Sequence, residues 1–157
     1  MTTTPVAADL AAEVDRVVGE HVGELVALRR QLHAHPEVSG GEVQTTRTVA
    51  ERLRIAGLTP TVLARGTGLV CDVVGESPLP LVALRADIDA LAMDDHTTTD
   101  YRSQVPGVAH ACGHDAHTAM LLGAGIVLAR LLPTSGIPGS VRLVFEPKTS
   151  KIEQQEL

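Results

Sequence analysis

Residues 108–132 read VAHACGHDAHTAMLLGAGIVLARLL, a polar segment followed directly by a long apolar one. Its first part is rich in His, Cys and Asp, whereas the part from Ala116 to Leu132 has almost no polar face. A helix that is apolar all round is buried on several sides. We expect such a helix to be capped by Asp115 and to end at Pro133. The apolar run is short and has polar residues at both ends, which favours a core helix over a membrane span.

The flanking sequence predicts two more helices. Apolar residues three or four positions apart predict a long helix over residues 10–32. It should stop near His35, because Pro36 disfavours helical geometry in the residue before it. A second helix is expected over residues 42–56, closed by Gly57.

Four short β-branched or apolar runs predict strands, at residues 59–64, 69–74, 79–85 and 141–145. The run Leu81–Leu84 is apolar at consecutive positions, so this strand is expected to be buried on both faces. Four strands are too few to cover the central helix. We therefore expect an α/β fold that forms a partial three-layer sheet sandwich, as one part of a larger sheet.

Composition limits the function. The 157 residues are long enough for one domain with its own core. A formal charge of -6 and a pI of about 5.6 argue against nucleic acid or an anionic membrane surface as partners. Cys71 lies in an apolar run and is expected to be an inert core residue. The first residues lack the pattern of a signal peptide, so a cytoplasmic protein is expected.

Two aspartates follow the third predicted strand in the motif LRADIDAL. Asp87 and Asp89 are two positions apart, and such residues point the same way in an extended chain. They lie just past the carboxyl end of a strand, where open α/β sheets place ligands. Two carboxylates directed at one site are therefore predicted, and a solvated loop that begins with two acids is the alternative.

His110, Cys112 and His114 are spaced two positions apart in the loop before the apolar helix. If that loop is extended, all three side chains project to one side. A thiolate beside imidazoles suits zinc, and manganese or cobalt less selectively. Gly113 permits a tight turn between two of them. A polar helix start without ligand function and a Cys–His nucleophile are the alternatives.

Four segments together resemble a known family, and they lie in the family's order and spacing. They read RRQLHAHPEVSGGE, LRADIDALAM, VPGVAHACGHDAHTAMLLGA and GSVRLVFEP. Over roughly residues 24–147 the chain is similar to the N-terminal portion of the metal-dependent amidohydrolases. These include hippurate hydrolase, N-acyl-amino-acid deacylases and hydrolases of indole-acetyl amino acids. The resemblance implies an α/β sheet sandwich in which two divalent ions activate a water that attacks an amide.

The resemblance also implies roles for individual residues. Cys112 and His114 correspond to the family's thiolate and imidazole metal ligands. The aspartates Asp87 and Asp89 would lie near the metal and orient ligands. Roles around the ligands or facing the substrate are expected for the remaining candidates, His110, Asp115 and His117. The implied substrate is a small N-acyl amino acid or peptide-like amide, and the implied metal is zinc or manganese.

The chain departs from the family pattern at its end. Thr149 and Ser150 stand where the family has two glutamates, one the general base and one a metal ligand, and Ala92 replaces a proline. We therefore divide the chain into residues 1–147, the N-terminal portion of a catalytic domain, and 148–157, an atypical polar tail. A truncated form that binds at most about one ion and is inactive alone is expected.

Two other functions remain open, a non-catalytic metal-binding remnant and a structural module with a metal-stapled loop. Residues 116–132 are expected to cause self-association through exposed apolar surface. If the chain were active, Glu146, His33 and His35 would be the first residues to examine.

Overall fold

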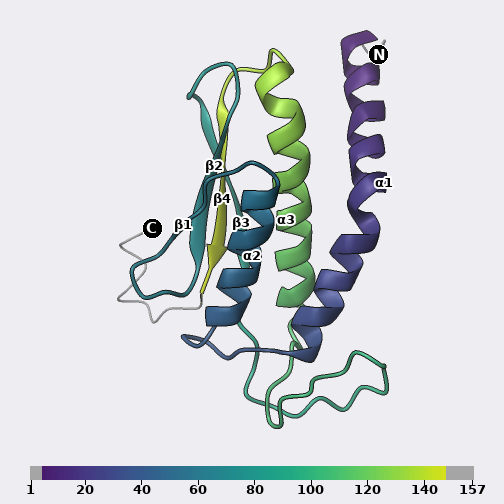
Figure 1. Ribbon diagram of the computed structural model, residues 1–157, viewed down its shortest axis with the longest axis vertical. Coiled ribbons are helices and arrows are strands. Elements are labelled where there is room, and N and C mark those ends of the chain that lie inside the picture. Colours follow the sequence, from purple (N-terminus) through teal and green to yellow (C-terminus); the bar gives the residue numbers. More distant parts are fainter. Residues whose placement is uncertain (1–4, 148–157) are drawn as a thin grey trace.

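The computed structural model describes residues 5–147, with side chains from residue 9 onward. Three helices and a four-stranded mixed sheet make up the fold (Figure 1). The elements follow in the order α1 (Pro5–Ala34), α2 (Val43–Ile55), β1 (Thr61–Val62), β2 (Leu69–Val74), β3 (Leu81–Asp87), α3 (His114–Leu131), the 3-10 turn η1 (Leu132–Thr134) and β4 (Ser140–Glu146). This is the predicted order, and the α/β fold class is confirmed.

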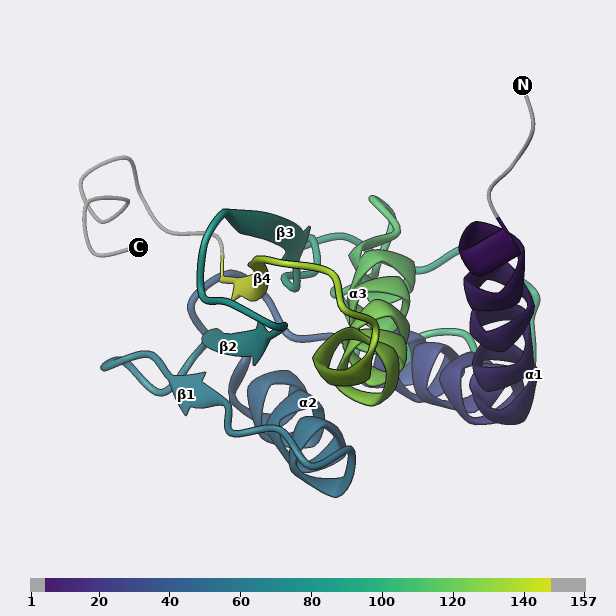
Figure 2. The same cartoon turned by 90° about the horizontal axis from the view of Figure 1, so that it is seen from above.

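The elements are layered. Seen from above, α2 and α3 lie beside one face of the sheet, and α1 packs on the far side of α3 (Figure 2). The two helix ends predicted from Pro36 and Gly57 are confirmed to within two residues, since α1 ends at Ala34 and α2 at Ile55. Gly57 has a φ of 83°, the left-handed conformation that closes helices.

The sheet has the order β1-β2-β4-β3. The strand β4 lies between β2, to which it is antiparallel, and β3, to which it is parallel. The prediction that Leu81–Leu84 are buried on both faces is wrong for this chain. Val82 is 54% exposed, and Leu81 and Leu84 are exposed as well. The reason is that β3 forms the edge of the sheet, where the described residues supply no further strand.

Two glycines bring α3 close to its neighbours. A Cβ atom at Gly125 would lie 2.6 Å from Leu143 Cδ1, and one at Gly123 would lie 2.8 Å from Leu25 Cδ1. Residues 114–134 have the length and a mean hydropathy of 1.4 that a membrane-crossing helix also has. The helix α3 packs against α1, α2 and the sheet, and 33% of this apolar window is buried. The helix is not buried all round, because His117, Met120 and Arg130 are exposed and many of its other residues are only partly buried.

The predicted cap of α3 is wrong. Gly113 is the N-cap residue, with a φ of 77°, and no side chain caps the helix. The Asp115 side chain is fully buried and points instead to α1, where it bonds to Arg29 and His33. The first turn of α3 is thus held by α1, and this contact positions the candidate site.

Candidate metal centre

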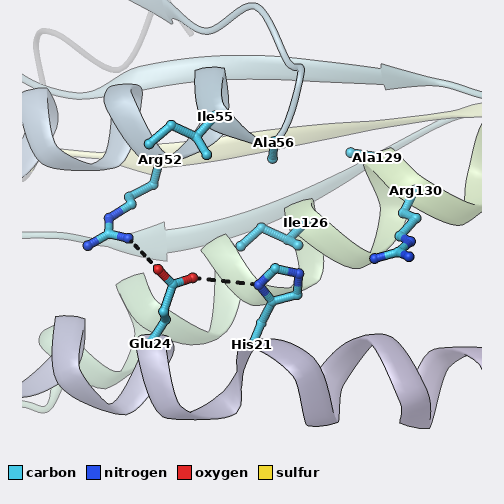
Figure 3. A pocket seen from close by; sticks show the side chains of 8 residues that line it. All are labelled: His21, Glu24, Arg52, Ile55, Ala56, Ile126, Ala129 and Arg130. Atoms are coloured by element: carbon cyan, nitrogen blue, oxygen red, sulfur yellow. Dashed lines mark hydrogen bonds and ion pairs between the residues drawn. The ribbon is translucent and has the colours of Figure 1, made fainter.

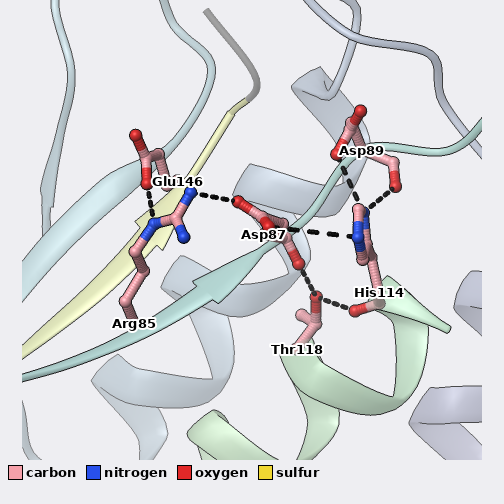
Figure 4. A network of polar contacts seen from close by, with 6 residues as sticks. All are labelled: Arg85, Asp87, Asp89, His114, Thr118 and Glu146. Atoms are coloured by element: carbon pink, nitrogen blue, oxygen red, sulfur yellow. Dashed lines mark hydrogen bonds and ion pairs between the residues drawn. The ribbon is translucent and has the colours of Figure 1, made fainter. Parts of the chain in front are cut away.

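His114, the first residue of α3, is held by Asp89. Its Nδ1 lies 2.9 Å from Asp89 Oδ1 and 2.9 Å from the Asp89 carbonyl oxygen (Figure 4). Both are acceptors, so Nδ1 carries the proton and donates it, and the lone pair lies on Nε2. A carboxylate that fixes the far nitrogen of a histidine is the usual support of a metal-ligating imidazole. Asp89 is buried, which suits this orienting position.

Asp87 faces the free nitrogen of His114. Its Oδ2 lies 3.9 Å from His114 Nε2, at the carboxyl end of β3. The prediction that Asp87 and Asp89 converge on one place is therefore confirmed, since both lie against the same imidazole. The Thr118 hydroxyl donates to the His114 carbonyl oxygen at 2.7 Å and ties the first turn of α3 together.

A cation already lies beside these carboxylates. Arg85 Nη2 donates to Asp87 Oδ1 at 2.6 Å, and Arg85 Nε contacts the Glu146 carboxylate from β4 (Figure 4). The Arg85 side chain is more than half exposed, whereas Glu146 is buried. The guanidinium therefore partly neutralises two groups that could otherwise bind a metal ion. Sequence reasoning missed Arg85, although its position two residues before Asp87 on the same strand face was the available signal.

The loop before α3 does not gather its three candidate ligands. The extended geometry expected for His110, Cys112 and His114 is wrong, because Gly113 turns the backbone and α3 begins at His114. Cys112 is exposed and free, and His110 is buried elsewhere. His117 is exposed and stacks on His114, with ring centroids 5.6 Å apart.

His110 belongs to a second polar cluster, between α1 and α3. Its ring lies 6.4 Å from that of His33, which bonds through Nδ1 to Asp115 Oδ2 at 2.7 Å. Arg29 Nε bonds to the same oxygen at 2.9 Å, and Asp95 Oδ2 lies 3.6 Å from His33 Nε2. No signal in the sequence links these residues, since they come from α1, the loop and α3.

Two pKa values in this cluster depart from their ordinary range. Burial lowers the pKa of His110 to about 4, because it disfavours the charged imidazolium, and neither ring nitrogen has a hydrogen-bond partner among the described residues. Backbone N–H groups of Ser103 and Thr97 lower the pKa of Asp95 to about 2, since they bond to its charged form. The cluster therefore combines a neutral imidazole with a firmly ionised carboxylate.

A hollow between α1, α2 and α3 contains no group of three metal-ligating side chains among the described residues. Arg52 Nη1 donates to Glu24 Oε1 at 3.0 Å, and His21 Nδ1 lies 3.6 Å from Glu24 Oε2 (Figure 3). Arg130, which also lines the hollow, pairs with Glu20 at 2.9 Å, so the charged groups of the hollow are all in ion pairs.

The described residues fit a metal only in part. His114 presents Nε2 and Asp87 presents a carboxylate, yet no three His, Cys, Asp or Glu side chains in residues 9–147 are grouped as a ligand set. Structural zinc sites use four protein ligands and catalytic ones usually three. The positions of Thr149 and Ser150 lie outside the described residues.

Fold and site together define an α/β domain with a partial metal site at a strand end. Residues 83–148 match the model of peptidase family M20/M25/M40. N-acetyl-L-cysteine deacetylase of Bacillus subtilis is 43% identical over 79% of this chain and 29% of its own length. N-acyl-L-amino acid amidohydrolase of Geobacillus stearothermophilus is 40% identical over 85% of this chain and 36% of its own length.

A solved structure agrees. The Bacillus subtilis YXEP protein, a dinuclear metal binding peptidase from the M20 family, matches 80% of this chain and 35% of its own, with a TM-score of 0.75 and 37% identity. The resemblance to the M20 peptidase/amidohydrolase family that the motifs predicted is confirmed, over part of the relatives' length. It spans 15% to 36% of the length of the curated relatives that it matches.

A third relative has a different name. A putative glutamate–cysteine ligase of Rhodococcus jostii is 52% identical over 79% of this chain, but the match covers 15% of that protein. Its name therefore describes a protein of which this segment is a minor part.

Proposed function

We propose that this chain contributes one half of a metal site to the hydrolysis of the amide bond of N-acyl amino acids, and that it does not catalyse this reaction alone. The observation that carries the proposal is the His114 imidazole fixed by Asp89, with Nε2 directed toward Asp87. The relatives support the substrate class, since they include an N-acyl-L-amino acid amidohydrolase and an N-acetyl-L-cysteine deacetylase.

Each residue has a distinct part in the proposed site. Asp89 holds the His114 tautomer, so that Nε2 can ligate zinc or manganese. Cys112, exposed one residue before the helix cap, would add a thiolate, and Asp87 a carboxylate. A bound divalent ion would supply Lewis acidity and lower the pKa of a bound water. Thr149 and Ser150 replace the family's glutamates, and a hydroxyl is a poor proton acceptor at neutral pH, so the proton transfer that hydrolysis needs would be missing.

Cobalt binding tests the metal half of the proposal. Titration with Co²⁺ should give a thiolate-to-cobalt absorption band and about one ion per chain, because few ligands are available. Cys112→Ser should remove the band, and Asp89→Asn should weaken binding roughly 10- to 100-fold, because a neutral amide replaces the charged carboxylate that supports the imidazole. His96→Ala is the matched control, since His96 is exposed and outside the site. Equal binding by wild type, Cys112→Ser and His114→Ala would refute the site.

An assay tests the other half. The chain with Mn²⁺ or Zn²⁺ should not hydrolyse hippurate or N-acetyl amino acids. Metal-dependent turnover that is lost in His114→Ala would show the chain to be an enzyme in its own right, and Glu146 would then be the first candidate base.

The second candidate function is a non-catalytic remnant. Arg85 favours it, because a guanidinium that binds both Asp87 and Glu146 competes with a metal ion for the same carboxylates. In that case the Co²⁺ titration would show no saturable site. A cytoplasmic location remains part of the proposal, and fractionation of the producing cell would test it.

A further inference from the structure

The helix α1 has an apolar face that the rest of the described chain does not cover. Val18, Val22 and Val26 lie four residues apart, so they form one row along the helix. All three are exposed, and Val22 is 50% exposed. The core side of α1 is a different face, on which Val17, Leu28 and Leu32 are buried. Figures 1 and 2 show α1 as the outermost helix, beyond α3.

A row of small residues runs beside the valines. Gly19, Gly23 and Ala27 are also four residues apart, Asp15 precedes them in the same row, and all four are exposed. A methyl group placed at Gly19 or Gly23 would meet no atom within 4 Å. The face therefore consists of a ridge of valines next to a shallow groove, which is the surface that lets two helices approach closely.

The charges of α1 are arranged around this face. Arg16 pairs with Glu13 and Glu20 within the helix. Asp15 and Arg30, at opposite ends of the face, make no ion pair among the described residues, and the Arg30 guanidinium lies 5.1 Å from the centre of the Tyr101 ring. The face thus has one unpaired acid at its N-terminal end and one unpaired base at its C-terminal end.

We propose that this face binds the same face of a second copy of the chain, with the two α1 helices antiparallel about a two-fold axis. An antiparallel register centred between Val22 and Gly23 sets each valine of the ridge against a small residue. Val22 lies opposite the partner's Gly23, and Val26 lies opposite the partner's Gly19. The ridge of each copy fills the groove of the other, as a two-fold interface requires.

The same register pairs the free charges. Arg30 lies opposite the partner's Asp15, and the symmetry repeats this pair at the other end of the interface. A parallel arrangement would set like charges at the same end. The charge pattern therefore favours a second copy in the antiparallel orientation, and it gives the interface its direction.

Self-association was expected from residues 116–132, whose apolar side chains are buried or partly buried, except for the exposed Met120. The exposed apolar rows lie on α1 and on the edge strand β3. Substitutions on each surface can therefore show which of the two causes self-association. Val22 and Val82 are matched for the comparison, because they are 50% and 54% exposed.

Sedimentation equilibrium of the full chain tests the proposal. The wild-type chain should be a monomer–dimer mixture at tens of micromolar, and Val22→Glu should be a monomer, while Val82→Glu should dimerise like wild type. Asp15→Arg should weaken the dimer about tenfold, because two attractive pairs become repulsive. The double variant Asp15→Arg/Arg30→Asp should restore dimerisation, since it exchanges the charges and keeps their complementarity. Far-UV circular dichroism checks that each variant is folded.

Three results would overturn the proposal. The first is a monomeric wild type at 100 µM, or about that concentration, which would leave the face to another partner. The second is loss of the dimer in Val82→Glu but not in Val22→Glu, which would assign association to the sheet edge. The third is a double charge variant no tighter than Asp15→Arg, which would exclude the antiparallel register.

Discussion

Two His–Asp pairs of similar geometry lie at the two sides of the first turn of α3. One presents a candidate metal ligand, and the other is a packing contact. The His114–Asp89 and His33–Asp115 contacts measure 2.9 and 2.7 Å, and both carboxylates are buried. Asp115 also binds Arg29, and the second nitrogen of His33 faces the carboxylate of Asp95.

The difference between the pairs lies in the second nitrogen of each imidazole. His114 Nε2 looks toward Asp87, which is partly exposed at the strand end. His33 is enclosed by carboxylates and by the Tyr101 ring, whose centroid lies 5.5 Å away. A His–Asp pair is therefore a candidate ligand only where its outer nitrogen remains accessible, and it is a packing element where that nitrogen is covered.

The largest expected effect is on the free energy of unfolding, which the two His–Asp pairs should affect to different extents. Asp115→Asn should lower the free energy of unfolding by about 3 kcal/mol, because Arg29 and His33 lose a buried counter-charge. Asp89→Asn should cost about 1 kcal/mol, since the amide oxygen still accepts from His114. Urea unfolding of both variants measures the difference. Equal losses would mean that the two pairs contribute equally to the stability of the fold.

The next largest effect is a loss of stability in acid, through His110 in the buried cluster between α1 and α3. The pKa of His110 is about 4 in the folded chain and 6.5 as the ordinary value. Between these values the unfolded chain binds more protons, so stability falls as the pH is lowered from 6.5 to 4 and is unaffected by this group above 6.5. The loss should reach at most about 3 kcal/mol. His110→Leu should flatten the profile in this window, measured with a chelator present, and an unchanged slope would contradict the assignment.

The smallest effect concerns the cation beside Asp87. Arg85→Gln should tighten Co²⁺ binding about threefold, because an exposed charge close to the carboxylates is removed and solvent screens most of its effect. Arg142→Gln is the matched control, since Arg142 pairs with Asp72 at 2.7 Å on the same sheet. An equal gain in both variants would indicate a general charge effect and not competition at the site.

The sequence was informative where local rules apply. Pro36 and Gly57 predicted the helix ends, and the two-residue spacing of Asp87 and Asp89 predicted their convergence. The same spacing failed for His110 because residues 110–113 form a turn, closed by the Gly113 N–H bond to the His110 carbonyl oxygen, and α3 begins at His114.

Contacts between segments that are distant in the sequence could not be predicted from these local rules. Asp115 was expected to cap its own helix, but it bonds instead to Arg29 and His33 from a distant segment. The apolar run of β3 correctly predicted a strand. Its exposure could not be read from the run, because burial depends on which strands lie beside it in the sheet.

The position of β4 has a consequence for the order of folding. This strand is the last element of the described chain, yet it lies between β2 and β3. Until residues 140–146 emerge during synthesis, β3 has no hydrogen-bonding neighbour, and β2 has only the two-residue strand β1. Before β4 is synthesised, the nascent chain therefore exposes an unpaired β3 and one unpaired edge of β2, and such strand edges are binding sites for chaperones.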